Sequence, residues 1–79
     1  MNTVIKLKHL GRDSWSRPVY MDGDGRLWKD VDPRTYRPPE LCTAMHNEFD
    51  GEPVTPIDYM QKYKGAQVEF IPRRDTWEW

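Results

Sequence analysis

The alternation of hydrophobic and polar positions predicts a series of short β-strands. Near the start of the chain, Ile5, Lys6, Leu7 and Lys8 alternate apolar and basic side chains, which is the period of a half-buried strand over residues 3–10. Four further runs are rich in β-prone residues and are bounded by turn-forming residues. They cover residues 17–21, 26–31, 41–45 and 67–71.

Turn-forming residues between these runs predict two chain reversals and one loop. Residues 22–25, Asp-Gly-Asp-Gly, join two β-prone runs and form the strongest hairpin pattern in the sequence. Residues 47–53 contain Asn, Asp, Gly and Pro, which turns select, so a second reversal is expected there. Residues 32–39 contain three prolines, and because proline removes a backbone donor we expect a connecting loop.

One short helix is predicted over residues 55–64. Thr55 is a suitable N-cap, Pro56 suits the first helical position, and Asp58 places an acid in the first turn. Gly65 is a typical residue just beyond a helix end. The apolar residues of this segment make it at most weakly amphipathic.

These elements together predict an α+β fold, with a small antiparallel sheet of four or five short strands and one short helix. An open barrel is one arrangement of such a sheet. The 79 residues suffice for one hydrophobic core, so we expect a single β-rich domain over residues 1–72. Residues 73–79 are expected to form a polar C-terminal tail with two tryptophans, of which Trp77 is expected to fold back onto the sheet.

Composition and charge narrow the function classes. Four Trp, four Tyr and two Phe supply apolar area for a core and argue against disorder. Twelve basic and thirteen acidic side chains leave a net charge of −1, which marks neither a nucleic-acid-binding protein nor a DNA mimic. Cys42 is the only cysteine, so an intramolecular disulfide is excluded and the reducing cytoplasm is expected. No uninterrupted apolar run approaches the length of a membrane span.

No residue pattern indicates catalysis, a metal or a cofactor. Cys42 and His46 are four positions apart, but together with His9 they would still need another ligand to complete a zinc site. As a nucleophile and its base, Cys42 and His46 would also need an orienting group and an oxyanion site. Residues 22–25 lack the further oxygen ligands of a calcium loop. We therefore expect a protein that is not an enzyme, with a small Cys42 hydrolase or metal enzyme as the third hypothesis.

A negative surface is predicted if the two turns lie together. Such a surface suits a basic partner, for example the nucleic-acid channel of another protein. The alternative is that these acids only solvate the turns, where Asp, Glu and Gly are common. The candidate partner-binding residues are Asp22, Asp24, Glu48, Phe49, Asp50 and Glu52.

Arginines interleaved with aromatic residues suggest direct nucleic-acid binding as an alternative function. Phosphate contacts and base stacking require these two residue types close together. The near-neutral charge opposes this hypothesis, and the aromatic residues of these loops have an equal chance of packing beneath them. The candidate nucleic-acid-binding residues are Arg12, Trp15, Arg34, Tyr36 and Arg37.

Four strings of sequence form a set: Ser-Arg-Pro-Val-Tyr at 16–20, Gly-Arg-Leu-Trp-Lys-Asp-Val at 25–31, Leu-Cys-Thr at 41–43 and Asn-Glu-Phe-Asp-Gly-Glu-Pro at 47–53. These strings resemble a group of small domains encoded on bacterial mobile elements, of the kind associated with large polyvalent proteins of phages and conjugative elements. The resemblance implies a mobile-element context, in which small stand-alone proteins often act against host defences, including anti-CRISPR inhibitors that occupy a nuclease. The first hypothesis is therefore a non-enzymatic protein-binding module that inhibits a host defence nuclease.

Overall fold

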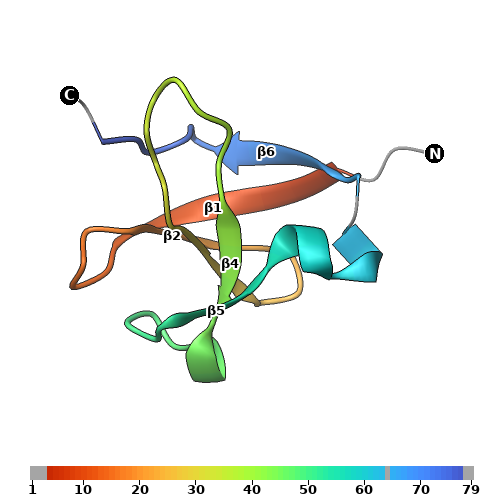
Figure 1. The fold of residues 1–79 in the computed structure, drawn as a ribbon, viewed down its shortest axis with the longest axis horizontal. Coiled ribbons are helices and arrows are strands. Elements are labelled where there is room, and N and C mark those ends of the chain that lie inside the picture. Colours follow the sequence, from red (N-terminus) through yellow and green to blue (C-terminus); the bar gives the residue numbers. More distant parts are fainter. Residues whose placement is uncertain (1–3, 64, 78–79) are drawn as a thin grey trace.

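A six-stranded sheet organises the protein in a computed structural model that describes residues 4–63 and 65–77 (Figure 1). The order of the strands across the sheet is β5-β4-β3-β2-β1-β6, so β5 and β6 are its two edges and the sheet is not closed. The strands are β1 (Val4–Arg12), β2 (Pro18–Met21), β3 (Leu27–Asp30), β4 (Leu41–Ala44), β5 (Pro53–Pro56) and β6 (Gln67–Ile71).

The sheet is mixed, whereas the sequence predicted an antiparallel one. Neighbouring strands from β1 to β5 are antiparallel, as expected for hairpins joined by short turns. β6 pairs with β1 in parallel, with Ile5 opposite Val68 and Leu7 opposite Phe70. β6 reaches this position because the chain between β5 and β6 passes from one edge of the sheet to the other. The small β-rich fold is confirmed, and the all-antiparallel arrangement is wrong.

The helix predicted over residues 55–64 is not confirmed. Thr55 and Pro56 belong to β5, where the Thr55 backbone N–H donates to Thr43 Oγ1 at 3.2 Å and Pro56 has an extended ψ of 144°. Two single 3-10 turns follow, η2 (Ile57–Tyr59) and η3 (Gln61–Tyr63), separated by Met60 in an extended conformation. Proline is tolerated on an edge strand, so the Thr-Pro pair that resembles a helix start continues the sheet instead.

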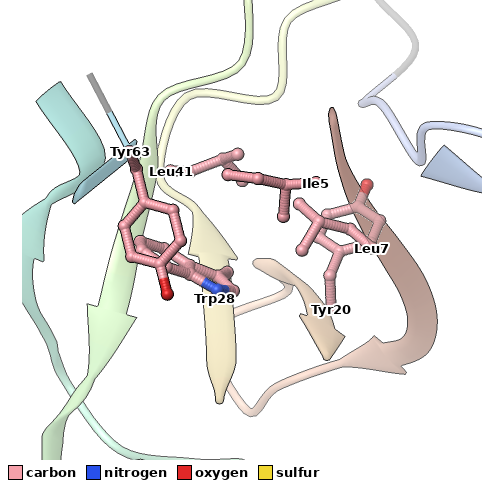
Figure 2. Close-up of a cluster of buried hydrophobic side chains, with 6 residues drawn as sticks. All are labelled: Ile5, Leu7, Tyr20, Trp28, Leu41 and Tyr63. Carbon is pink, nitrogen blue, oxygen red and sulfur yellow. The ribbon is translucent and has the colours of Figure 1, made fainter. Parts of the chain in front are cut away.

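The main core lies on one face of the sheet (Figure 2). Tyr63 from η3 covers Trp28 of β3 edge-on, with ring centroids 5.2 Å apart and an interplanar angle of 86°. Such an aromatic pair stabilises by about 0.5 to 1.5 kcal/mol beyond the area that it buries. The segment of the two 3-10 turns therefore covers this face of the sheet, with Ile57 and Met60 also packed against the core. The buried residues of this core are Ile5, Leu7, Tyr20, Trp28, Leu41 and Tyr63.

A second, smaller core lies on the opposite face and contains Val19, Leu27 and Ala44. Lys29 shares this face, because its side chain alternates with that of Trp28 along β3 and its partner across β2 is Val19. Lys29 is completely buried. A buried ammonium needs a partner, and the loops that cover this face supply it.

Residues 72–77 follow β6 and run beside the proline-containing loop of residues 31–40 (Figure 1). The Trp77 backbone N–H donates to Pro33 O at 2.8 Å, and its indole Nε1 donates to Ser16 O at 2.8 Å. Trp77 thus joins two loops that are distant in the sequence. Trp79, the other tryptophan of the predicted tail, lies outside the described residues.

Among the residues that the structure describes, no helix has the length and apolar character that crossing a lipid bilayer requires.

Candidate partner-binding surface

Asn47 brings the two predicted turns together. Its Oδ1 accepts a hydrogen bond from the Leu27 backbone N–H at 2.7 Å, and its Nδ2 donates to Gly25 O at 2.9 Å. The residue has a φ of 53°, a left-handed conformation that Asn adopts more readily than most residues. The turn after β2 and the turn after β4 are therefore neighbours. We call their exposed acids and the adjoining ring the acidic turn surface, which consists of Asp24, Glu48, Phe49, Asp50 and Glu52.

Asp22, the sixth predicted partner-binding residue, faces the interior. Its Oδ1 accepts the backbone N–H groups of Asp24 at 2.9 Å and Arg26 at 3.0 Å, and its Oδ2 accepts the Trp28 indole N–H at 3.0 Å. These bonds shape the turn and anchor it to the main core. Asp22 therefore positions Asp24, whose side chain is exposed.

The turn of residues 45–52 is closed by its own backbone. Met45 N–H donates to Glu52 O at 2.8 Å, and Gly51 N–H donates to Glu48 O at 3.0 Å. A methyl group on Gly51 would collide with the Met45 carbonyl oxygen, so only glycine fits here. The ring of Phe49 lies over Gly11, where β1 carries an irregularity in its pairing with β2.

A buried ionic cluster beneath this turn holds it on the sheet. Lys29 Nζ donates to Asp13 Oδ2 at 2.6 Å and to the Phe49 carbonyl oxygen at 2.7 Å. Arg17 Nε donates to the same Asp13 oxygen at 2.8 Å. Asp13 Oδ1 accepts the backbone N–H groups of Trp15 and Arg17, so both carboxylate oxygens are used. We call Asp13, Arg17 and Lys29 the Lys29 cluster.

The charge of Asp13 is strongly favoured in the folded protein. Burial by itself raises the pKa of the Asp13 carboxyl, but the hydrogen bonds from Lys29 and Arg17 together outweigh it and lower the pKa to about 2. The carboxylate therefore remains ionised over the physiological range. It ties the loop of residues 13–17 to the turn of residues 45–52 through a single fixed cation.

The acids of the acidic turn surface are exposed, but some of them also contact neighbouring residues. Asp50 Oδ1 accepts the Ser14 backbone N–H at 3.0 Å, which leaves its second oxygen directed elsewhere. Glu52 lies 3.8 Å from Arg17, and Asp24 lies 3.9 Å from Lys62. Both pairs are long and lie partly in solvent, where an ion pair contributes about 0 to 1 kcal/mol. These two ion pairs therefore restrain Glu52 and Asp24 only weakly.

A hollow of about 700 Å³ borders this surface between the turn after β2 and η3. Its lining includes Asp24, Gly25 and Arg26 of the turn after β2, Thr43 of β4, Asn47, and Lys62 and Tyr63 of η3. A volume of this size accommodates a large side chain or a short segment of a partner. The acidic turn surface is therefore adjacent to a concave region.

The arginines that are candidates for nucleic-acid binding form ion pairs with carboxylates. Arg12 contacts Asp75 through Nε at 2.9 Å and Nη2 at 2.7 Å, and its hydrogen bonds are the largest cause that lowers the Asp75 pKa. Arg34 makes a similar bidentate contact with Asp32 at 2.7 and 2.9 Å, and Arg37 lies 3.5 Å from the same carboxylate. Each positive charge therefore has a negative neighbour.

The two aromatic candidates for nucleic-acid binding, Trp15 and Tyr36, have exposed side chains. Trp15 is 68% exposed and Tyr36 is 74% exposed, so neither packs beneath its loop. Tyr36 stays close to Arg34, whose guanidinium lies 5.8 Å from the ring centroid. The structure thus offers stacking faces here, but with little unbalanced positive charge beside them.

Cys42 and His46, considered above as metal ligands or as a nucleophile and its base, differ in their exposure to solvent. Cys42 is buried, and burial followed by the charges of Glu40 and Asp30 raises the pKa of its thiol. His46 is exposed at a φ of 55°. Within the described part of the chain, no three His, Cys, Asp or Glu side chains come together as metal ligands.

Sequence reasoning missed Asp13, Lys29 and Asn47 as the residues that build the surface. The sequence did contain one indication of the role of Lys29, since this lysine directly follows the apolar pair Leu27-Trp28 inside a predicted strand. Its partner Asp13 lies 16 positions earlier, in a loop, and no spacing rule connects the two. Asn47 was identified only as a turn former.

Comparisons with protein-family models, with curated proteins and with solved structures find no match for this chain.

Proposed function

We propose that the protein is a non-enzymatic binding module whose acidic turn surface docks on a basic surface of another protein. The observation that supports this proposal is the pair of hydrogen bonds from the Asn47 side chain, which joins the two acidic turns into one surface. The Lys29 cluster then fixes that surface to the sheet. A preorganised surface loses less conformational entropy on binding than a mobile loop does.

The electrostatics of the surface suit a cationic partner. Acids on neighbouring turns steer a basic partner during encounter and exclude acidic ones. Phe49 adds an apolar contact among the charges, and aromatic residues are common at the energetically important positions of interfaces. The hollow beside Asp24 gives a partner side chain a place to enter.

The finer proposal concerns the partner. A groove that binds nucleic acid presents rows of Lys and Arg, and a rigid acidic surface of this kind competes for such a groove. Combined with the resemblance to mobile-element domains, this makes a host defence nuclease the proposed target. In that role the protein acts as an anti-CRISPR-like inhibitor in the cytoplasm, by occupying the nuclease and without a reaction of its own.

The test is affinity capture with a matched pair of charge reversals. Tagged protein is incubated with bacterial lysate that has been treated with nuclease, and retained proteins are identified by mass spectrometry. Glu48→Lys reverses a charge on the acidic turn surface, whereas Glu69→Lys makes the same change on β6. We expect the retained nuclease to bind wild type and Glu69→Lys alike, and to bind Glu48→Lys at least about tenfold more weakly, since charge reversal costs more than about 1.4 kcal/mol at a complementary contact.

Equal retention by all three proteins would contradict the proposal. Recovery that disappears on nuclease treatment would instead favour direct nucleic-acid binding. That outcome is checked with Arg34→Glu and Arg37→Glu, which should then abolish recovery, while Glu48→Lys should increase it.

A further inference from the structure

A second concave region lies at the other end of β4 and β5, away from the acidic turn surface. It has a volume of about 580 Å³, within the range of peptide and ligand sites. Its walls are formed by the loop before β4, with Pro38 and Pro39, and by the end of β5 and η2, with Pro56, Ile57 and Tyr59. We call this region the proline groove.

The walls of the proline groove are rigid and poor in donors. Each proline has a fixed φ and no backbone N–H, so the walls have little freedom to lose when a ligand is ordered against them. Met60 N–H donates to Ile57 O at 3.0 Å and closes the turn that displays Tyr59. The Tyr59 side chain is 82% exposed, which is unusual for so large an aromatic residue in a chain with a small core.

The charges at the groove have one sign. Glu40 and Asp58 are exposed at its rim, and none of the described residues that line it is Lys, Arg or His. Cys42 is a buried residue of the lining, and burial, followed by the charges of Glu40 and Asp30, raises the pKa of its thiol. The groove is therefore apolar within and negative around.

We propose that the proline groove binds an extended segment of a protein partner in which proline or aliphatic residues are flanked by arginine or lysine. An apolar groove with an exposed aromatic ring complements the flat, preformed surface of a polyproline II segment. The two rim carboxylates complement flanking cations. The groove is independent of the acidic turn surface, so the inference stands whether or not that surface binds its own partner.

The experiment uses the intact protein and a defined probe. The probe is a fluorescein-labelled peptide with a Pro-Leu-Pro-Pro core and arginines on both sides. Two control peptides replace either the arginines by glutamates or the core by Gly and Ser. Binding is measured by fluorescence anisotropy at low and high salt, and the rate of Cys42 alkylation by iodoacetamide reports occupancy of the groove, since Cys42 is the only cysteine.

We expect the arginine-flanked probe to bind, and both control peptides to bind at least about tenfold more weakly. Tyr59→Ala should weaken binding about tenfold, as for an aromatic contact at an interface centre. Glu40→Gln and Asp58→Asn should each weaken it about threefold and reduce its salt dependence. Tyr36→Ala, which removes an equally exposed tyrosine outside the groove, should have no effect. Bound probe should slow Cys42 alkylation, and Tyr59→Ala should remove this protection.

Three results would overturn the inference. They are absence of probe binding, equal binding of the three peptides, and equal binding to wild type and Tyr59→Ala. Binding without slower alkylation of Cys42 would place the probe elsewhere and would also overturn it. Because Tyr59, Glu40 and Asp58 are exposed, their variants are expected to fold, and circular dichroism verifies this before binding is measured.

Discussion

Two neighbouring residues of β3 are the buried centres of two different ionic clusters. Lys29 points to one face of the sheet and belongs to the Lys29 cluster with Asp13 and Arg17. Asp30 points to the other face and lies 3.5 Å from the Arg74 guanidinium, and we call this pair the Asp30 cluster. Both β3 side chains are fully buried. The first cluster holds the acidic turn surface, and the second holds residues 72–77.

The two buried carboxylates, Asp13 and Asp30, differ in the hydrogen-bond donors that the protein supplies to them. Asp13 receives an ammonium at 2.6 Å, a guanidinium at 2.8 Å and two backbone N–H groups, and its pKa falls to about 2. Asp30 receives backbone N–H groups from Asp32 and Glu40 at 3.2 and 3.1 Å and a more distant guanidinium. Burial consequently raises the Asp30 pKa, because these donors offset only part of the lost hydration. Of the two buried carboxylates, Asp13 therefore has the closer and more numerous donors.

The largest expected effect is that of removing Lys29. In Lys29→Met the buried Asp13 carboxylate loses its cation, and the free energy of unfolding should fall by about 3 to 5 kcal/mol, as for other broken buried pairs. Urea denaturation at neutral pH measures the change. Lys8→Met makes the same substitution at an exposed position of β1 and should change stability by less than about 0.5 kcal/mol. Similar losses in both variants would show that Lys29 has no special role.

The next effect is the pH dependence that Asp13 produces. Its folded pKa lies below the unfolded value of 3.8, so its contribution of about 2 kcal/mol is present above that pH and is lost as pH falls toward 2. Asp30 has the opposite sign: its raised pKa destabilises the fold as pH rises above the unfolded value. The stability difference between wild type and Asp13→Asn should therefore stay nearly constant from neutral pH to about pH 5 and shrink between about pH 5 and pH 2. A difference that stays constant in urea melts over this range would contradict the assignment.

A smaller loss is expected for Arg74→Met. Arg74 donates to Arg37 O at 2.6 Å and to Arg34 O at 3.2 Å, in addition to its contact with Asp30. We expect a loss of about 1 to 2 kcal/mol, because Asp30 takes up a proton more readily than Asp13 does. The neighbouring exposed residue supplies the control, Arg73→Met. A loss in Arg74→Met as large as that in Lys29→Met would remove the contrast between the clusters.

The smallest effect on stability is expected for Asn47→Gly. This variant should nevertheless separate the two turns that form the acidic turn surface. Glycine accepts the φ of 53° but makes neither side-chain hydrogen bond, so stability should fall by about 1 kcal/mol. Amide hydrogen exchange should rise in residues 22–27 and 45–52, and not in β1 or β6. Uniformly faster exchange, or none, would show that Asn47 does not join the turns.

Local patterns were sufficient to predict five of the six strands, β1 to β4 and β6, but not β5. Alternation at Ile5 and Leu7 and the turn residues 22–25 correspond to β1 and to the connection between β2 and β3. The Thr55-Pro56 pair was misassigned because the same residues suit a helix start and an edge strand, and tertiary pairing with β4 decides between them. Hydrophobic period also cannot name the partner of a strand, so the parallel pairing of β6 was not predictable.

In the candidate site, too, local patterns could not predict contacts between side chains that are distant in the sequence. The acids of the two turns were visible in the sequence, and the turns do lie together. Asp22 was grouped with them because its interior hydrogen bond to Trp28 depends on the hairpin geometry. Lys29 and Asp13 were not paired, because a charged residue in a strand is normally assigned to solvent and its partner is supplied only by the folded loops.

Zero-length cross-linking identifies the carboxylates that touch a bound partner. A carbodiimide couples carboxylates to lysines in contact with them, and in nuclease-treated bacterial lysate it captures whichever protein is bound. If the acidic turn surface is the docking site, mass spectrometry should find cross-links from Glu48, Asp50 or Glu52 to lysines of one retained protein, and these should disappear in Asn47→Gly. Cross-links to that protein from Glu69 alone, with none from residues 48–52, would contradict the account.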